Sequence, residues 1–396
     1  MCRWRAILPA ALRSFSLLAM SAAVVGCSNS SGSGVSVAHD SSPVSRPDSA
    51  LGTTPDDASG NSTAPTTPPS TIVPQVWDAI SAPSNCMCSD GSSFHFFLHR
   101  ADPTKVVFFL EGGGACFDAG TCGPSSTTFR RTVDHDDNLA DTTHGIFDFT
   151  DARNPFKNWS VVYVPYCTGD VHLGNITRDY GNGVVIHHNG FVNASTVLNA
   201  LAQFFPGTAT LVVAGESAGS IAAPLFAGMA HDLLPAATIK VLADGSGAYS
   251  DIPAINTVIG TAWGTPDAIP PWPENQGQTV ATWSIPGLFI QAHKHDPRIV
   301  FARHDYAFDE VQATFSALAG IPAGQLDILI DANGRQIRAT GTPLSSFVSP
   351  GARHTVLAQP RFYSEAVDGT SLLAWVSDFV AGKPVADVHC TDCKNG

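Results

Sequence analysis

The sequence predicts an α/β protein in which helices cover both faces of a mostly parallel central sheet. From residue 92 onward, short apolar runs alternate with segments of helical pattern, which is typical of parallel strands joined by helices. One run, residues 211–214, leads directly into the pentapeptide GESAG (215–219), and an Ala-rich segment of helical composition follows at 220–230. A strand, a sharp turn and a helix in this order indicate the centre around which the domain is organised.

The remaining elements follow the same alternation along the chain. Apolar runs predict further strands at 94–98, 105–110, 161–165, 239–243, 288–291, 299–302 and 346–348. The pattern predicts further helices at 191–205 and 310–319. Residues 259–278 carry many Pro and Trp residues, so we expect an irregular insertion that caps the site.

The composition sets the size of the domain and excludes one class of partner. With 396 residues, of which 44% are hydrophobic, the chain can bury a large core in one α/β domain. Only 14% of the residues are charged, the formal net charge is −13, and no basic stripe is visible. Nucleic acid is therefore not expected as a partner.

The N-terminus has the pattern of an export signal. Arg3, Arg5 and Arg13 precede or flank an apolar segment at 15–25 that is too short for an ordinary transmembrane helix. The segment ends in VVGC (24–27), which resembles a bacterial lipobox with Cys27 as the lipid-modified residue. We expect residues 1–27 to be a lipoprotein-type signal peptide and the protein to reach the cell surface or outer membrane. An ordinary secretory signal, with a secreted or periplasmic product, is the alternative.

A polar segment separates this signal from the domain. Residues 28–71 contain no aromatic side chain and are dominated by Ser, Thr, Pro, Gly, Asp and Ala. Such a segment cannot bury enough apolar area to offset the entropy of ordering, so we expect a disordered tether. The folded domain is then expected to span residues 72–396.

Cysteines beyond the signal region are expected to form disulfides, because export places them in an oxidising compartment. Cys116 and Cys122 flank a short loop and can form a local pair. Cys390 and Cys393 form a C-x-x-C, which predicts a terminal disulfide or a bond from this pair to Cys86. A zinc site would need a second pair of ligands beside it, which the sequence does not show.

The pentapeptide at 215–219 has the G-x-S-x-G pattern of a nucleophile elbow. A serine at the corner between strand and helix projects free of both, and the flanking glycines avoid clashes with them. The amide of Ala218 and the start of the helix then point toward developing negative charge at Ser217. The alternative is a Gly-rich turn without chemistry.

A serine nucleophile needs a base, and in α/β-hydrolases the chain order is Ser, acid, His. His354 follows the strand at 346–348 and a Pro-Gly turn, which is the expected place for the base. His389 lies beside the terminal cysteines and is expected to be structural or exposed.

The acid should lie between the serine and the histidine. Asp305 and Asp309 both follow the strand at 299–302, and Asp244 is a rival one strand earlier. Asp309 stands at the start of a predicted helix, where an N-cap is the alternative role. The residues alone leave this choice open.

Three glycines supply a candidate oxyanion hole. Residues 112–114 follow the buried strand at 105–110, as the glycine-rich loop follows the third strand in esterases. Glycine lets backbone amides face a ligand without an intervening side chain.

Seven motifs together resemble the pectin acetylesterase family of α/β-hydrolases. They are LEGGGACF (110–117), VPYCTGDVHLGN (164–175), HHNGFVNASTVL (187–198), GESAGS (215–220), ADGSGAY (243–249), FDEVQ (308–312) and GARHTVL (351–357). The resemblance covers most of residues 86–360, and the motifs stand in the family's order.

The resemblance implies a role for each site residue. It implies Ser217 as nucleophile, Asp309 as acid, His354 as base, and oxyanion amides at Gly113, Gly114 and Ala218. It also implies the disulfides Cys88–Cys167 and Cys116–Cys122, with Cys86 reaching the C-terminal pair. Two positions depart from the family pattern: Gly114-Ala115 replaces an aromatic residue, which changes the acyl pocket, and Ser220 replaces a glycine.

The function that we expect is two-step ester hydrolysis through an acyl-serine, with deacetylation of a polysaccharide such as pectin as the reaction. An esterase for longer acyl groups is the alternative, and a non-catalytic cell-surface glycan-binding protein is an alternative of another class. No metal or organic cofactor is needed for this chemistry. We expect a monomer that meets its ester substrate and touches a membrane only through an N-terminal lipid anchor.

Overall fold

The computed structural model describes residues 77–134, 140–321 and 323–394. The expected signal peptide with Cys27, the expected tether and the first residues of the expected domain lie outside these ranges. Within the described ranges, no helix is both long enough and apolar enough to span a bilayer.

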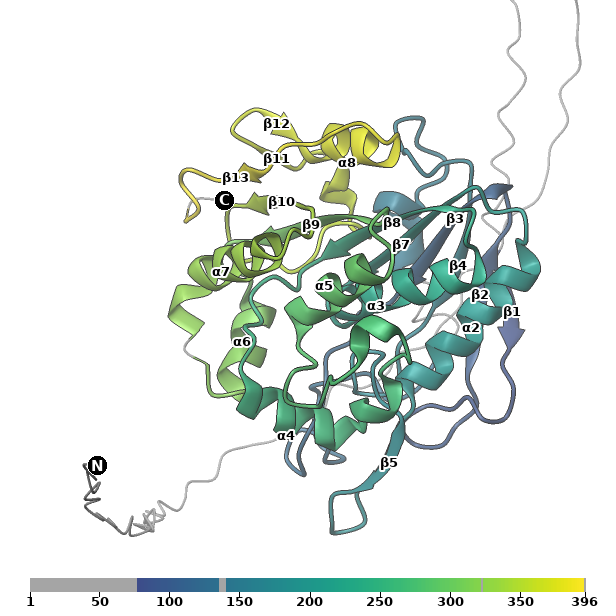
Figure 1. The fold of residues 1–396 in the computed structure, drawn as a ribbon, viewed down its shortest axis with the longest axis vertical. Helices are drawn as coiled ribbons and strands as arrows, with labels where there is room; N and C mark the ends of the chain where they lie inside the picture. The colour runs from purple at the N-terminus through teal and green to yellow at the C-terminus, as the bar shows by residue number, and fades with distance from the viewer. Residues whose placement is uncertain (1–76, 135–139, 322, 395–396) are drawn as a thin grey trace, which may run out of the picture. The chain divides into compact units, whose positions relative to one another are not determined.

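In the described residues, nine strands form one sheet in the order β1-β2-β4-β3-β7-β8-β9-β10-β13 (Figure 1). They are β1 (Asp78–Ser81), β2 (His95–His99), β3 (Asp102–Leu110), β4 (Trp159–Val164), β7 (Thr210–Glu216), β8 (Thr238–Asp244), β9 (Val300–Tyr306), β10 (Leu344–Ser349) and β13 (Val388–His389). β1, β2 and β4 pair antiparallel, whereas all pairs from β4 to β13 are parallel. The predicted mostly parallel sheet is confirmed.

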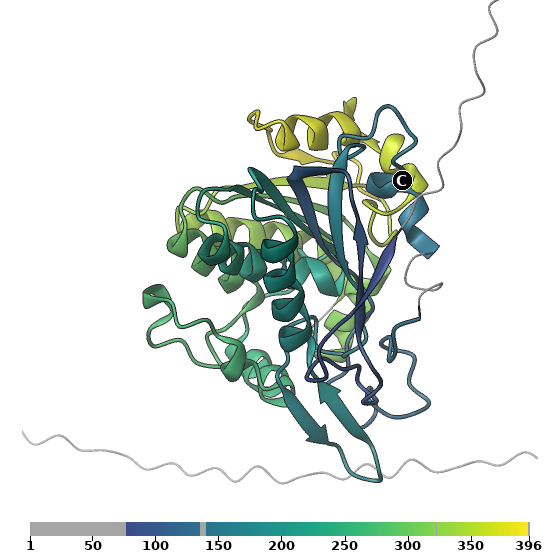
Figure 2. The same cartoon turned by 90° about the vertical axis from the view of Figure 1, so that its right-hand side faces the viewer.

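Helices lie on both sides of this sheet (Figure 2). In the described residues they are α2 (Gly190–Phe204), α3 (Ala218–Leu233), α4 (Pro253–Trp263), α5 (Ile285–His295), α6 (Glu310–Leu318), α7 (Leu326–Ala339) and α8 (Leu372–Val380). Helices α2, α3 and α5 share a core with Phe108 and Val213, whereas α8 shares the opposite core with Phe109 and Val212. Because neighbouring strand residues point to opposite faces, the unbroken apolar runs of β3 and β7 supply both cores.

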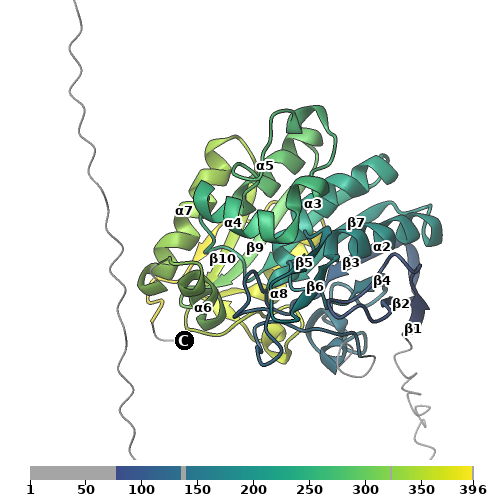
Figure 3. The ribbon, with the colours of Figure 1, turned by 90° about the horizontal axis from the view of Figure 1, so that it is seen from below.

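Two small antiparallel pairs lie outside the main sheet. One joins β5 (Ile176–Asp179) to β6 (Val185–His188), and the other joins β11 (Ala366–Val367) to β12 (Thr370–Ser371). The β5–β6 hairpin lies beside α4 (Figure 3).

One predicted strand is wrong. Residues 288–291 lie inside α5. Ser284 caps this helix by accepting a hydrogen bond from Gly287 N at 3.1 Å, and Pro286 stands in its first turn. A short apolar run such as residues 288–290 fits a buried strand and a buried helix equally well, so the cap and the proline decide. The other predicted strands and helices are present, with ends that differ by a few residues.

The segment at 259–278 is more ordered than we expected. The end of α4 occupies its first residues, and two 3₁₀ helices follow, Thr265–Ala268 and Pro273–Asn275. Pro266 and Pro273 stand at the starts of these short helices, where a missing N–H costs nothing.

Candidate active site

Ser217 stands at the corner between β7 and α3 with φ 51° and ψ −119°. A non-glycine residue in this region is strained, which is typical of a nucleophile elbow. There is no room for a β-carbon at the glycine on either side of this corner. A β-carbon at Gly219 would overlap the carbonyl oxygen of Leu110, and one at Gly215 would lie 2.5 Å from the Gly219 carbonyl carbon. The two glycines are therefore required by contacts at the end of β7.

His354 and Asp309 are hydrogen-bonded to each other. His354 Nδ1 lies 2.7 Å from Asp309 Oδ2, and Asp309 is fully buried. A carboxylate only accepts, so Nδ1 donates to it, and in a neutral imidazole Nε2 then keeps its lone pair. Nε2 is buried and has no hydrogen-bond partner among the described residues. In its neutral form the imidazole can therefore accept a proton at Nε2.

Ser217 and His354 both contact the same short segment at the end of β8. Ser217 N donates to Asp244 O at 2.7 Å. A β-carbon at Gly245 would lie 3.2 Å from His354 Cε1, so the imidazole packs directly over this glycine. The nucleophile elbow, Asp309 and His354 follow β7, β9 and β10, and the carboxyl ends of parallel strands meet at one edge of the sheet.

The two rival carboxylates have other partners. Asp244 Oδ1 lies 2.7 Å from His304 Nδ1, and Asp305 Oδ2 lies 2.8 Å from the Nε of buried Arg303. Burial raises the pKa of Asp305, although Arg303 and neighbouring hydrogen bonds oppose this. Among the three candidates in the described residues, Asp309 is the one bonded to His354.

The glycines at 112–114 pass beside Ser217. A β-carbon at Gly112 would lie 2.9 Å from Ser217 Cβ, and one at Gly113 would overlap the ring of Tyr166. Tyr166 donates from its hydroxyl to Gly114 O at 2.9 Å and so fixes the loop from behind. In the described part of the chain, neither the Gly113 nor the Gly114 amide donates to a protein acceptor. These amides, with that of Ala218 at the start of α3, are free to receive an anion.

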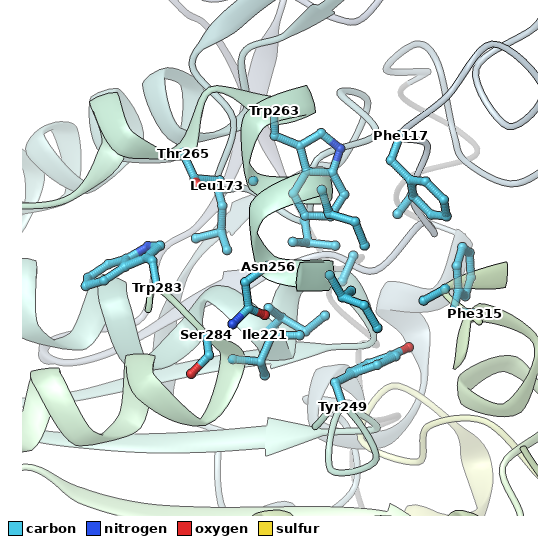
Figure 4. Close-up of a pocket in the computed structure, with 18 of the residues that line it drawn as sticks. Phe117, Leu173, Ile221, Tyr249, Asn256, Trp263, Thr265, Trp283, Ser284 and Phe315 are labelled. Atoms are coloured by element: carbon cyan, nitrogen blue, oxygen red, sulfur yellow. The ribbon is translucent and has the colours of Figure 1, made fainter. Parts of the chain in front are cut away.

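A largely apolar pocket opens from Ser217 and Ala218 (Figure 4). Large side chains from several elements line it, among them Phe117, Ile221, Trp263, Leu288 and Phe315. Gly114 and Ala115, where the family pattern has an aromatic residue, also line this pocket. The segment at 259–278 contributes to its wall through Ile259, Gly260, Trp263 and Thr265, in agreement with the expected cap.

The structure contains the disulfides Cys88–Cys167, Cys116–Cys122 and Cys390–Cys393. Cys86 is a free, buried thiol, so the expected link from it to the C-terminal pair is wrong. His389 lies beside the terminal pair and is exposed. Because the sulfurs of this C-x-x-C are bonded to each other, they offer no thiolates to a metal.

Comparisons with known proteins find similar sequences among esterases. The pectinacetylesterase family model matches residues 73–262. Palmitoleoyl-protein carboxylesterase NOTUM of Homo sapiens is 25% identical over 313 residues, which are 72% of this chain and 62% of that protein. Pectin acetylesterase 7 of Arabidopsis thaliana is 24% identical over 180 residues, 43% of this chain and 45% of that protein.

The solved structure of the Wnt deacylase Notum from Drosophila shares the fold, with a TM-score of 0.59 and 19% identity. The match covers 79% of this chain and 96% of that one. The chain matches less than two thirds of the length of the NOTUM relatives from human and mouse. Residues 73–262 therefore match the pectinacetylesterase family, and the chain shares the α/β-hydrolase fold of the Notum structure.

Proposed function

We propose that the protein is a serine carboxylic-ester hydrolase. The observation that carries the proposal is the 2.7 Å contact between His354 Nδ1 and Asp309 Oδ2. It leaves Nε2 without a partner in the described chain, on an imidazole packed beside the Ser217 elbow. The names of the relatives, carboxylesterases and a pectin acetylesterase, support the same reaction class.

The mechanism follows from the positions of these groups. His354 Nε2 takes the proton of the Ser217 hydroxyl as Oγ attacks the ester carbonyl, and the oxyanion is held by the amides of Gly113, Gly114 and Ala218. His354 then returns the proton to the departing alcohol, and an acyl-serine remains. A water activated by His354 releases the acid, while Asp309 stabilises the imidazolium in both steps. Every proton transfer is made by this chain's own residues, so the mechanism requires no metal or organic cofactor.

Two substrate classes fit the proposed reaction. An acetylated polysaccharide such as pectin is the first, and the family supports it. An ester with a longer apolar acyl group is the second, and the pocket favours it because Phe117, Trp263 and Phe315 line a space beside Ser217. Activity on p-nitrophenyl esters of increasing chain length, followed by acetylated pectin and xylan, separates the two classes.

The catalytic assignment is tested at the nucleophile. Ser217→Ala should abolish turnover by several orders of magnitude while the protein stays folded. A serine-directed fluorophosphonate should label the wild-type protein and leave this variant unlabelled. Labelling of the variant would show that another serine reacts. A wild-type protein that neither hydrolyses esters nor accepts the label would favour the non-catalytic glycan-binding alternative.

We propose that the protein is exported as a lipid-anchored monomer, with residues 1–27 as signal, 28–71 as tether and 72–396 as catalytic domain. The basic and apolar N-terminal pattern supports export, and so do three disulfides in the described residues. Lipid on Cys27 would be its only contact with a membrane. Mass spectrometry of the mature N-terminus tests this, and an unmodified N-terminus after residue 27 would indicate ordinary secretion.

A further inference from the structure

We infer that Asp244 and Arg361 form a clamp that holds the loop at 354–357 in a strained turn and thereby positions His354. The inference rests on the proposed function, because it concerns how the proposed base is held. Neither residue is assigned a contact with substrate, and both are positioning residues. The clamp is carried by five hydrogen bonds, four to this loop and one to the Ser217 elbow.

Asp244 holds the loop through its carboxylate. Oδ2 accepts from Val356 N at 2.7 Å and from Leu357 N at 2.8 Å, and Asp244 is fully buried. The backbone oxygen of the same residue accepts from Ser217 N at 2.7 Å. One residue at the end of β8 therefore fixes the backbone on both sides of the proposed proton transfer. Asp244 Oδ1 is itself held by His304 Nδ1, at 2.7 Å.

Arg361 holds the opposite side of the loop. It stands on the 3₁₀ helix Pro360–Tyr363, and its Nη2 donates to Thr355 O at 2.6 Å and to His354 O at 3.2 Å. Its guanidinium also lies over the ring of Tyr306, 5.5 Å from the centroid. The carbonyl groups of His354 and Thr355 thus face the Arg361 guanidinium, and the amides of the next two residues face the Asp244 carboxylate.

The turn needs such a clamp because Thr355 has φ 57°. This left-handed conformation is disfavoured for L-residues and rarely adopted by β-branched ones. Strained backbone of this kind persists only where its surroundings impose it. Without the clamp, residue 355 would relax to negative φ and carry the preceding imidazole away from Asp309. A displacement of about 1 Å at a catalytic group can cost on the order of 10²-fold in rate.

The decisive comparison is Arg361→Met against Arg353→Met. Arg353 lies in the same loop region, is exposed, and has no hydrogen bond or ion pair among the described residues. We expect Arg361→Met to lower kcat by about 10- to 100-fold with KM within about twofold. Arg353→Met should leave both constants unchanged. Equal activity of the two folded variants would overturn the clamp.

A second substitution separates positioning from general damage. Glycine adopts positive φ freely, so Thr355→Gly removes the strain that the clamp opposes. The double variant Arg361→Met/Thr355→Gly should recover most of the lost kcat, although it has lost a further side chain. A folded double variant that stays as slow as Arg361→Met would also overturn the inference. If Arg361→Met does not fold, Arg361→Lys replaces it, because lysine keeps the charge but not the planar guanidinium whose Nη2 donates to both carbonyls.

Hydrogen exchange tests the clamp independently of esterase activity. The amides of Val356 and Leu357 should exchange faster in Arg361→Met and Asp244→Asn than in wild type or Arg353→Met, at matched global stability. A wild-type protein without esterase activity but with this pattern would reject the proposed function and keep the clamp. An active wild-type protein whose loop amides do not respond to Arg361→Met would keep the function and reject the clamp.

Discussion

His354 Nδ1 lies 2.7 Å from Asp309 Oδ2, and the same carboxylate caps the helix that follows it. Asp309 Oδ1 accepts from the amides of Val311 and Gln312 at 2.9 and 3.0 Å, while Oδ2 also accepts from Gln312 Nε2 at 3.1 Å. The N-cap and the histidine partner are therefore two roles of one buried group. The cap fixes the orientation that the second role requires.

Replacing this carboxylate should separate the two roles. Asn is as good an N-cap as Asp, so Asp309→Asn should fold. The Asn amide no longer holds His354 in the tautomer that accepts the serine proton, so we expect kcat to fall about 10⁴-fold. The assay is ester turnover at pH 7 with circular dichroism of each variant. Asp327→Asn, in the first turn of α7, is the control. Near-wild-type turnover of Asp309→Asn would show that another carboxylate is the acid.

The sequence predicted those parts of the site that depend on local pattern. The elbow at 215–219 is a strand, a turn and a helix within one short stretch, and His354 follows the last long strand. The choice among the carboxylates is not local. Asp244 accepts hydrogen bonds from amides 112 and 113 residues away, and no local sequence pattern predicts that contact. Strand order made Asp305 and Asp309 candidates, and only the family motif at 308–312 selected Asp309.

The misses in the fold have the same origin. Strands β1 and β13 are short and partly polar, and they exist because a neighbouring strand offers a hydrogen-bonded edge. Helix α7 was not predicted, although Leu326, Ile330 and Ile337 stand on one helical face, because Asn333 and Gly334 interrupt the apolar stripe on that face. The pairing of Cys86 could not be predicted, because it depends on distances that only the fold sets.

The oxyanion loop should be intolerant of side chains. Gly113 has φ 155°, and a β-carbon there would overlap the ring of Tyr166. We expect Gly113→Ala to displace the loop amides and lower kcat by about 10²- to 10³-fold, as loss of an oxyanion donor does. Gly181→Ala is the control, since Gly181 also has positive φ but no atom of a described residue within 4 Å of the added carbon. Equal activity of the two variants would show that the loop is not part of the site.

The two loop disulfides should differ in their effect on stability. Cys88–Cys167 closes a separation of 79 residues, whereas Cys116–Cys122 closes one of six. On chain entropy alone, removing the first should cost about 4–5 kcal/mol of unfolding free energy and removing the second about 2 kcal/mol. Paired Cys→Ala variants, unfolded in urea, measure both. A larger loss for the short loop would show that its contacts, and not chain entropy, dominate.

Stability should depend on pH through three buried groups. Burial lowers the pKa of His172 and His188 to about 4, and it raises that of Asp170 to about 6. Between pH 6.5 and 4 the unfolded state binds more protons at each histidine, so their contribution to stability is lost as pH falls. Between pH 6 and 3.8 the folded state binds more protons at Asp170, so its contribution grows as pH falls. The single aspartate offsets only part of the loss from two histidines.

Two variants should change this profile in opposite directions. His188→Gln should make the loss of stability from pH 7 to 4.5 shallower, because one destabilised imidazolium is gone. Asp170→Asn should make the loss steeper, because the offsetting group is gone. Urea midpoints at pH 7, 6, 5 and 4.5 provide the measurement. Parallel profiles for wild type and both variants would contradict the assignment.

The apolar pocket should set the acyl chain length, and α4 offers a matched pair to test it. Ile255, Ile259 and Trp263 follow one another at four-residue spacing and line the pocket that begins at Ser217, whereas the neighbouring Val258 is 65% exposed. Each methylene group that enters the pocket should raise kcat/KM by up to about fourfold, so octanoyl esters should exceed acetyl esters in the wild type.

Ile259→Trp fills the pocket, and it should remove most of the octanoyl advantage while acetyl turnover changes by less than about threefold. Val258→Trp adds the same side chain on the solvent side and should leave the chain-length profile unchanged. If both variants keep the wild-type profile, the acyl group does not enter this pocket. If the wild type itself prefers acetate, the acetylated polysaccharide becomes the better substrate class.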